Sequence, residues 1–125
     1  MTRKVLLVDD SGLARRSTRR ILEGAGYEVV EAEDGMSALE RYFVEKPGVV
    51  MLDLVMKGMY GLDVLSKLRE LDPGARVVVM SADVQTSSRE MVQAAGASGF
   101  LTKPAAPDDL LAAIERACTG GSSWC

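Results

Sequence analysis

The stretch Val49-Val50-Met51-Leu52-Asp53 decides the fold, because four apolar residues lead directly into an acid. This run is short and rich in β-branched residues, and Gly58 and Gly61 follow soon after it. Such a pattern is typical of a strand buried on both faces of a parallel sheet. Asp53 would then lie at the carboxyl end of the strand, and open α/β sheets bind their ligands at the carboxyl ends of their strands. The sequence therefore predicts a functional carboxylate at the end of a central strand.

Four other segments have the composition of strands, and helical patterns separate them along the chain. The other predicted strands are 5–8, 27–32, 76–80 and 99–102, and the predicted helices cover about 12–25, 35–46, 62–71, 86–95 and 107–117. Ser11 is the expected N-cap of the first of these helices, and Asp34-Gly35 opens the second. The strand 27–32 contains two glutamates, which predicts a place at or near the sheet edge. Alternating strands and helices predict a parallel sheet with right-handed crossovers, covered by helices on both faces.

The apolar stripes of the predicted helices indicate which side chains face the sheet. They include Ala38, Tyr42 and Phe43 in the second helix, Leu71 in the third and Met91 in the fourth. The fourth helix has the thinnest stripe, because Ala94 and Ala95 supply the rest of it. We therefore expect Phe43, Leu71 and Met91 to contribute to the core.

Composition narrows the class of protein. The 125 residues fit one domain, which we expect over 1–118, and 119–125 have no helical pattern and are expected to form a flexible tail. No apolar run reaches the roughly 18 residues that span a bilayer, and the net charge of −3 argues against direct nucleic-acid binding. The two cysteines, Cys118 and Cys125, do not indicate a disulfide framework. We expect a cytoplasmic protein without membrane insertion.

Polar residues follow four of the five predicted strands. In a parallel sheet these residues would all lie at the carboxyl ends of the strands, and they are Asp9 and Asp10, Asp53, Ser81 and Lys103. Two carboxylates about 4 Å apart repel by about 4 kcal/mol at an effective dielectric constant near 20. A cation would compensate such a cluster, and an all-oxygen site with two or three carboxylates suits Mg²⁺ or Mn²⁺.

The chain contains no histidine, so neither a Ser-His nor a Cys-His nucleophile can be built. A carboxylate nucleophile remains available in Asp53. Lys103 suits a phosphate as a point charge, and the hydroxyl of Ser81 can donate a hydrogen bond to a phosphoryl oxygen. The chemistry implied is transfer of a phosphoryl group onto Asp53.

The motifs resemble the receiver domain of two-component response regulators, over about residues 3–118. The resemblance rests on Asp9-Asp10, on Asp53 within Asp-Leu-Val-Met-x-Gly-Met-x-Gly, on Ser81-Ala82 and on Lys103-Pro104. It implies a flavodoxin-like (CheY-like) three-layer sandwich, with a five-stranded parallel sheet of order 2-1-3-4-5 and five helices.

The resemblance also implies a role for each site residue. Asp53 would be the phosphoacceptor, served by a sensor histidine kinase or a phosphotransfer protein. Asp9, Asp10, Asp53 and the backbone carbonyl of Val55 would hold Mg²⁺. The phosphate-binding and switch residues would be Ser81, Ala82, Lys103 and Phe100, and the Lys103–Pro104 peptide bond would be cis.

The sequence departs from the family pattern just after the phosphoacceptor. Lys57 stands where proline is common, and Tyr60 stands where an acid often precedes the glycine. Val55 is apolar and cannot orient an attacking water, so we expect a comparatively long-lived phosphoryl-aspartate. Asp83, two residues after Ser81, is an alternative source of that function.

Other interpretations of the same residues stay open. The acid pair at 9 and 10 could cap the first helix, and Phe100 could be a core residue. The arginines at 15, 16, 19 and 20 could form a solvated face or a docking site for the kinase.

The function expected overall is a phosphoacceptor switch that assists its own phosphorylation and dephosphorylation and is not a conventional enzyme. Phosphorylation would change the surface formed by the fourth helix, fifth strand and fifth helix, and a target protein would bind that surface. The protein is expected to be a monomer or a weak dimer formed through the same surface. A stand-alone regulator is expected. The alternatives are a receiver domain of a longer transcription factor or enzyme, and a small phosphatase with an aspartyl-phosphate intermediate.

Overall fold

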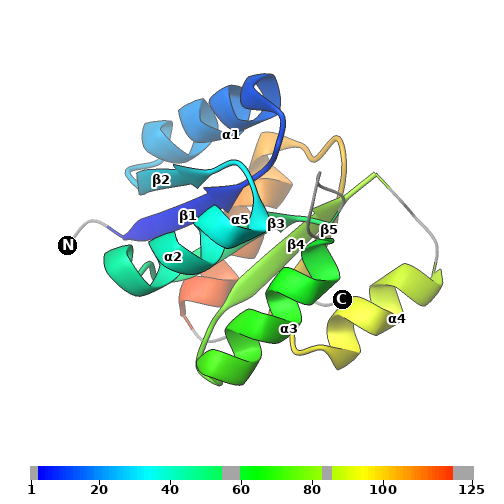
Figure 1. Cartoon of the computed structure of the whole chain (residues 1–125). Helices are drawn as coiled ribbons and strands as arrows, with labels where there is room; N and C mark the ends of the chain where they lie inside the picture. The colour runs from blue at the N-terminus through cyan, green and yellow to red at the C-terminus, as the bar shows by residue number, and fades with distance from the viewer. Residues whose placement is uncertain (1–2, 55–59, 83–85, 120–125) are drawn as a thin grey trace.

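The computed structural model describes residues 3–54, 60–82 and 86–119, in which strands and helices alternate along the chain (Figure 1). The strands are β1 (Lys4–Val8), β2 (Glu28–Ala32), β3 (Val49–Asp53), β4 (Val77–Ser81) and β5 (Gly99–Thr102). The helices are α1 (Gly12–Gly24), α2 (Gly35–Glu45), α3 (Gly61–Leu71), α4 (Thr86–Ala94) and α5 (Pro107–Cys118). All strand pairs are parallel, in the order β2-β1-β3-β4-β5. The predicted flavodoxin-like fold is confirmed, and β2 lies at a sheet edge as expected.

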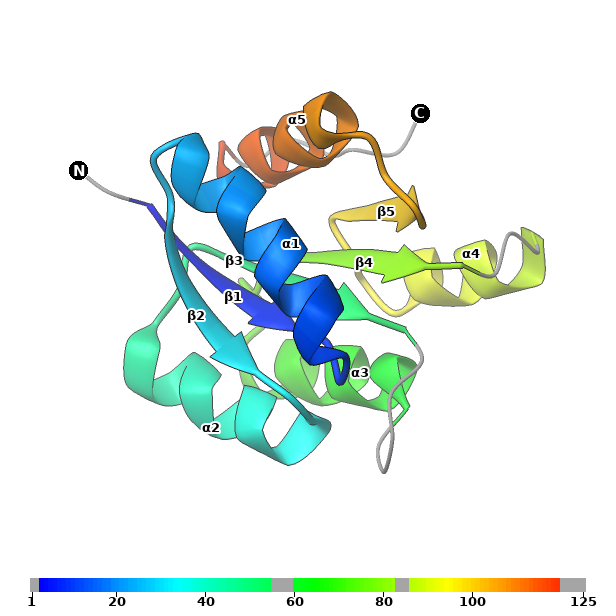
Figure 2. The same ribbon diagram turned by 90° about the horizontal axis from the view of Figure 1, so that it is seen from above.

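Helices cover both faces of the sheet and make a three-layer sandwich. Helices α1 and α5 lie on one face, and α2, α3 and α4 lie on the other (Figure 2). Alternate residues of β3 face opposite cores: Val50 and Leu52 pack toward α2 and α3, whereas Val49 and Met51 pack toward α1 and α5. This period of two explains why the strands are continuously apolar, since each side chain meets a helix layer.

Capping side chains and a proline fix where three of the helices begin. The Ser11 hydroxyl accepts a hydrogen bond from the Ala14 N–H at 3.2 Å, and a carboxylate oxygen of Asp34 accepts one from the Ser37 N–H at 2.8 Å. Pro107 is the first residue of α5, where its missing N–H costs no helical hydrogen bond. The expected Ser11 cap is therefore present, and Asp34 caps α2 in the same way.

Three apolar side chains that were expected in the core are largely exposed. The exposed fractions are 46% for Phe43, 51% for Leu71 and 51% for Met91. In α2 the other expected residues Ala38 and Tyr42 are buried, so only Phe43 at the edge of the stripe is exposed, and in α4 Val92 is buried one position after the expected Met91. Leu71 is the last residue of α3. The expectation was wrong at these positions because neighbouring residues of a helix point about 100° apart.

Among the helices of the described residues, none is long and apolar enough to cross a membrane. Helix α5 ends at Cys118, and Thr119 is its C-cap. The expected tail beyond it, residues 120–125, lies outside the described ranges.

Candidate functional site

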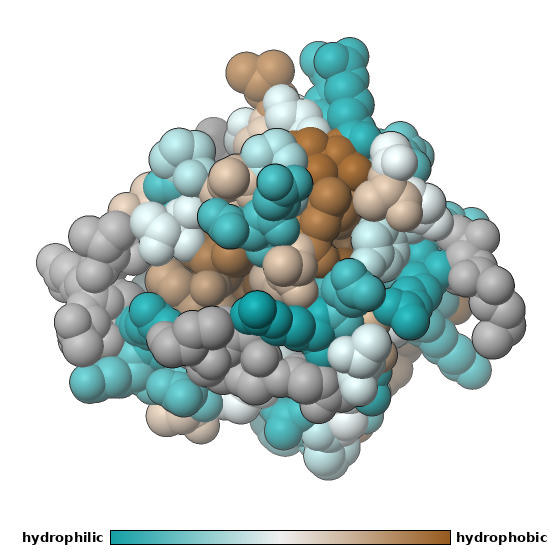
Figure 3. Space-filling view, turned by 180° about the vertical axis from the view of Figure 1, so that it is seen from behind, coloured by the Kyte–Doolittle hydropathy of each residue, from teal (hydrophilic) through white to brown (hydrophobic). Residues whose placement is uncertain are grey.

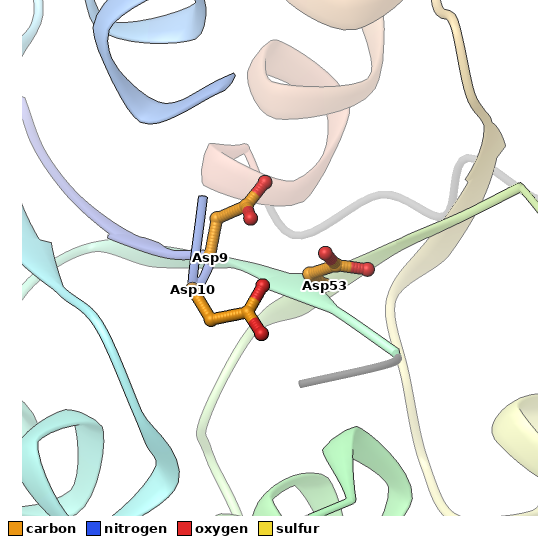
Figure 4. Close-up of side chains that lie close together, drawn as sticks. All are labelled: Asp9, Asp10 and Asp53. Carbon is orange, nitrogen blue, oxygen red and sulfur yellow. The ribbon is translucent and has the colours of Figure 1, made fainter. Parts of the chain in front are cut away.

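The register of the sheet brings three carboxylates together. Val8 of β1 pairs with Leu52 of β3, so the residues that follow each of them, Asp9 and Asp53, lie side by side. Asp10 is the next residue of the turn into α1. Each of these acids offers an oxygen within 4.8 Å of the others, and their side chains surround one space at the carboxyl edge of the sheet (Figure 4). The sequence predicted this cluster correctly.

Lys103 bridges two of the three acids. Its ammonium lies 2.9 Å from Oδ2 of Asp9 and 3.1 Å from Oδ2 of Asp53. The Lys103 backbone N–H donates to the Ser81 carbonyl at 2.8 Å, which ties the start of the β5–α5 turn to β4. The Lys103–Pro104 peptide bond is cis, in agreement with the expectation.

The acids also determine the protonation of the lysine. Burial alone would lower the pKa of Lys103, but its hydrogen bonds to Asp9 and Asp53 outweigh that effect and raise the pKa above the ordinary lysine value. Lys103 is therefore a fixed positive charge at neutral pH. Three carboxylates and one ammonium give this cluster a formal net charge of minus two, which suits a divalent cation.

The three acids differ in how deeply they are held. Asp9 is 2% exposed and Asp53 is 8% exposed, whereas Asp10 lies closer to solvent. Both carboxylate oxygens of Asp9 accept hydrogen bonds, Oδ1 from the Ser11 N–H at 2.9 Å and Oδ2 from Lys103. Asp9 is thus a fixed part of the site.

Ser81 and Phe100 belong to β4 and β5, the two strands that follow β3 in the sheet. Asp53 pairs with Met80, so Ser81 lies one residue further toward the edge, and it is buried. Ala82, which follows it, is exposed. Phe100 pairs with Val79 and is half-buried against the core on the α2, α3 and α4 side. The structure therefore brings Asp9, Asp10, Asp53 and Lys103 together and places Ser81 at the same end of the neighbouring strand, whereas Phe100 lies two strands away from Asp53.

Two expected site residues, Val55 and Asp83, lie outside the described residues, as does Lys57. Tyr60 is described. It precedes α3, is 41% exposed and makes no side-chain cap for the helix.

One contact at the site was missed in the sequence. Arg15, expected on a solvated face or a docking surface, donates from Nη1 to the backbone carbonyl of Asp9 at 2.6 Å and from Nε to Glu31 at 3.0 Å. The helical spacing of the arginines placed Arg15 and Arg19 on one face, but no local pattern connects that face with a glutamate of β2.

Comparisons with known proteins identify the family of this chain. The family model of the response regulator receiver domain matches residues 5–115. Chemotaxis protein CheY of Thermotoga maritima is 36% identical over 117 residues, which are 93% of this chain and 98% of that protein. The nitrate/nitrite response regulator protein NarP of Escherichia coli is 40% identical over 119 residues, which are 94% of this chain and 55% of NarP.

A solved structure gives the same result for the fold. The crystal structure of a two-component response regulator of the LuxR family, from an Aurantimonas species, has a TM-score of 0.93 at 32% identity. The match covers 99% of this chain and 90% of that one.

Fold and site together define a doubly wound α/β protein with a carboxylate and lysine cluster at the carboxyl edge of its sheet. The chain belongs to the family of response regulator receiver domains, which serve two-component signalling. Receiver domains are signalling switches and not conventional enzymes.

Proposed function

We propose that Asp53 accepts a phosphoryl group from a phosphohistidine on a sensor histidine kinase or a phosphotransfer protein. The observation that carries the proposal is the position of the Lys103 ammonium between Asp9 and Asp53. A carboxylate oxygen of Asp53 forms a bond to phosphorus while the bond between phosphorus and the imidazole nitrogen breaks. The imidazole keeps that electron pair and is protonated from water. The products are phosphoryl-aspartate and a neutral histidine on the donor.

In this proposal Asp9, Asp10 and Asp53 would coordinate a divalent cation, together with the backbone carbonyl of Val55. Three carboxylates within 4.8 Å of one another fit the oxygen ligands that Mg²⁺ or Mn²⁺ prefers. When bound, the ion neutralises charge on the phosphoryl oxygens as they approach the acids. The role of Asp9 is to hold Lys103 as well as to face the ion, since its Oδ2 already accepts from that ammonium.

The chain's own residues then bind the new group. Lys103 exchanges part of its contact with the Asp53 carboxylate for a phosphoryl oxygen, and Ser81 donates its hydroxyl to another. Phosphorylation adds about 1.5 to 2 negative charges, which attract both side chains. Movement of Ser81 and Ala82 toward the phosphate would open space for Phe100 to turn inward, and the α4–β5–α5 surface would change shape for a target protein.

A donor protein has to reach Asp53 from the carboxyl edge of the sheet. An apolar groove of about 430 Å³ opens there between α1 and α5, and its lining includes Ile21, Leu110 and Lys103. Apolar surface is also exposed between more polar side chains in the view from behind (Figure 3). We propose that the donor docks along this groove in the cytoplasm, and that the receiver is a monomer or a weak dimer through α4, β5 and α5.

The testing experiment uses a small acyl phosphate as donor. The protein is incubated with the acyl phosphate and Mg²⁺, and its intact mass is measured. A phosphoryl adduct is expected in the wild type and not in Asp53→Asn. Equal adducts in both proteins would contradict the assignment of Asp53. An adduct that does not depend on Mg²⁺ would contradict the cation site.

The switch is tested separately with Ser81→Ala. This variant should still form the adduct, because Asp53 is unchanged, but its phosphorylated form should bind a target protein more weakly. Equal target binding by the two phosphorylated proteins would refute the coupling between Ser81 and the α4–β5–α5 surface. Decay of the adduct, followed by mass over time, tests the proposed long phosphoryl lifetime.

The receiver function is proposed for either protein context. The chain matches nearly the whole length of a chemotaxis regulator and about half of NarP. In both contexts the same site would accept the phosphoryl group, and only the output would differ.

A further inference from the structure

An ion-pair network connects α1, β2 and the turn that carries the acid pair. Glu31 accepts one arginine on each carboxylate oxygen, Arg15 at 3.0 Å on Oε1 and Arg19 at 2.5 Å on Oε2. Arg15 has a second contact, because its Nη1 donates to the Asp9 backbone carbonyl at 2.6 Å. The guanidinium of Arg15 therefore holds Glu31 and the Asp9 carbonyl at the same time.

The network is more enclosed at Arg15 than at its outer end. The exposed side-chain fractions are 18% for Arg15, 30% for Glu31 and 40% for Arg19. Burial raises the pKa of Glu31, but hydrogen bonds from Arg19 and Arg15 outweigh it and hold the pKa below the ordinary glutamate value. Glu31 is thus ionised at neutral pH and keeps the Arg15 fork in one orientation.

The Asp9 peptide is held from several directions. Its N–H donates to the Ala32 carbonyl at 3.2 Å, its carboxylate binds Lys103 and the Ser11 N–H, and its carbonyl accepts from Arg15. That carbonyl belongs to the peptide unit whose nitrogen is that of Asp10. Fixing its direction therefore fixes the backbone from which the Asp10 carboxylate projects.

We propose that Arg15, held in place by Glu31, is a positioning residue that orients the Asp10 carboxylate for the divalent cation. The inference rests on the proposed function of the acid cluster. Arg15 does not contact the phosphoryl group in this proposal. It acts through the Asp9 carbonyl, as outer residues commonly orient the ligands of a metal.

The sign of the effect separates positioning from simple electrostatics. Arg15 is a positive charge close to the acids, so removing it should strengthen the attraction of a divalent cation if charge were its whole contribution. If Arg15 positions Asp10, its removal should weaken cation binding in spite of the more negative site. A role in stability alone would leave the affinity of the folded protein for Mg²⁺ unweakened.

The test measures the dissociation constant for Mg²⁺ of the unphosphorylated protein, from shifts of backbone amide resonances at low ionic strength. Arg15→Gln is compared with wild type and with Arg19→Gln. The control also loses an α1 arginine with two carboxylate contacts, to Glu23 and Glu31, but among the described residues Arg19 makes no hydrogen bond or ion pair with the turn at residues 9–11. We expect Mg²⁺ to bind Arg15→Gln about tenfold more weakly, and Arg19→Gln with wild-type or slightly higher affinity.

The outcomes distinguish this inference from the proposed function. If Arg15→Gln binds Mg²⁺ as tightly as wild type or more tightly, the positioning role is refuted. Equal weakening in Arg15→Gln and Arg19→Gln would refute it as well. If wild type itself binds no Mg²⁺, the proposed cation site fails first. Should Arg15→Gln not fold, Arg15→Lys is measured, because lysine keeps the charge but lacks the fork that holds Glu31 and the carbonyl together. It too should bind Mg²⁺ more weakly, and wild-type affinity would refute the inference.

Discussion

The ammonium of Lys103 lies 3.1 Å from Oδ2 of Asp53, so the proposed phosphoacceptor is already in contact with the ammonium that would bind an oxygen of its phosphoryl group. Because Asp9 holds the same ammonium at 2.9 Å, Lys103 can transfer one contact to a phosphoryl oxygen and still remain anchored. A partly buried charge with two partners is costly to leave unpaired. This arrangement fixes the lysine before any donor arrives.

Lys103→Gln should slow phosphorylation of Asp53 by an acyl phosphate. A hydrogen bond to a charged group contributes about 1.5 to 3 kcal/mol, which corresponds to about 10- to 100-fold in rate. The rate is followed by intact mass at fixed Mg²⁺, with Lys67→Gln on the exposed side of α3 as the control. A Lys103→Gln rate within twofold of the control would show that the lysine does not assist the transfer.

The stability contributed by Lys103 should depend on pH in the alkaline range. Its pKa is raised in the folded protein, so the contribution is complete below the ordinary value of 10.5 and is lost as pH rises through the folded-state pKa. Free energies of unfolding are measured in urea from pH 8 to pH 12 for wild type and Lys103→Met, without divalent cations. The difference between them should be constant at first and then shrink. A difference that grows with rising pH contradicts the sign of the shift.

The sequence was sufficient for the fold and the acid cluster because both depend on strand ends. Each buried strand is a short apolar run, and in a parallel sheet the residues after such runs must share an edge. The positions of the strand ends therefore predicted that Asp9, Asp53 and Lys103 lie close together, although Asp9 and Lys103 are 94 positions apart in the chain.

Sequence reasoning failed where one helix position or a nonlocal partner decides the outcome. In α4 both Met91 and Val92 are apolar, and only packing against the sheet determines that Val92 is buried. Arg15 lies 16 positions from Glu31, on a helix whose polar face has several arginines. Nothing local distinguishes the arginine that reaches the acid turn from those that do not.

Gly61→Ala should disturb the end of β3. A Cβ at position 61 would lie 2.5 Å from the Asp53 carbonyl oxygen and 2.6 Å from Leu54 Cα, which are backbone atoms of the last residue of β3 and of the residue after it. Overpacking of this kind costs about 1 to 3 kcal/mol. We therefore expect a lower free energy of unfolding in urea, together with slower phosphorylation, because the Asp53 backbone has to move.

Gly48→Ala is the matched control for that substitution. Its added Cβ would meet its nearest heavy atom, the Lys4 carbonyl oxygen, at an ordinary 3.7 Å. This variant should change stability by no more than about 0.5 kcal/mol and should keep the wild-type phosphorylation rate. If Gly61→Ala behaves like Gly48→Ala in both measurements, close packing at position 61 does not constrain the site.

Tyr42→Phe should destabilise the packing of α2 against the C-terminal end of α3 without affecting phosphorylation of Asp53. The buried Tyr42 hydroxyl donates to Oδ2 of Asp72 at 2.6 Å, which ties α2 to the C-cap of α3. Losing this hydrogen bond should lower the free energy of unfolding by about 1 kcal/mol, measured in urea at pH 7. The exposed Tyr60→Phe serves as control and should change the free energy of unfolding by no more than about 0.5 kcal/mol.

Because the hydrogen bond from Tyr42 lowers the pKa of Asp72, the effect of Tyr42→Phe should shrink as pH falls through that lowered pKa and the carboxylate takes up a proton. An effect of Tyr42→Phe that stays the same in acid would show that the Tyr42 hydroxyl stabilises the protein without a charged acceptor at Asp72.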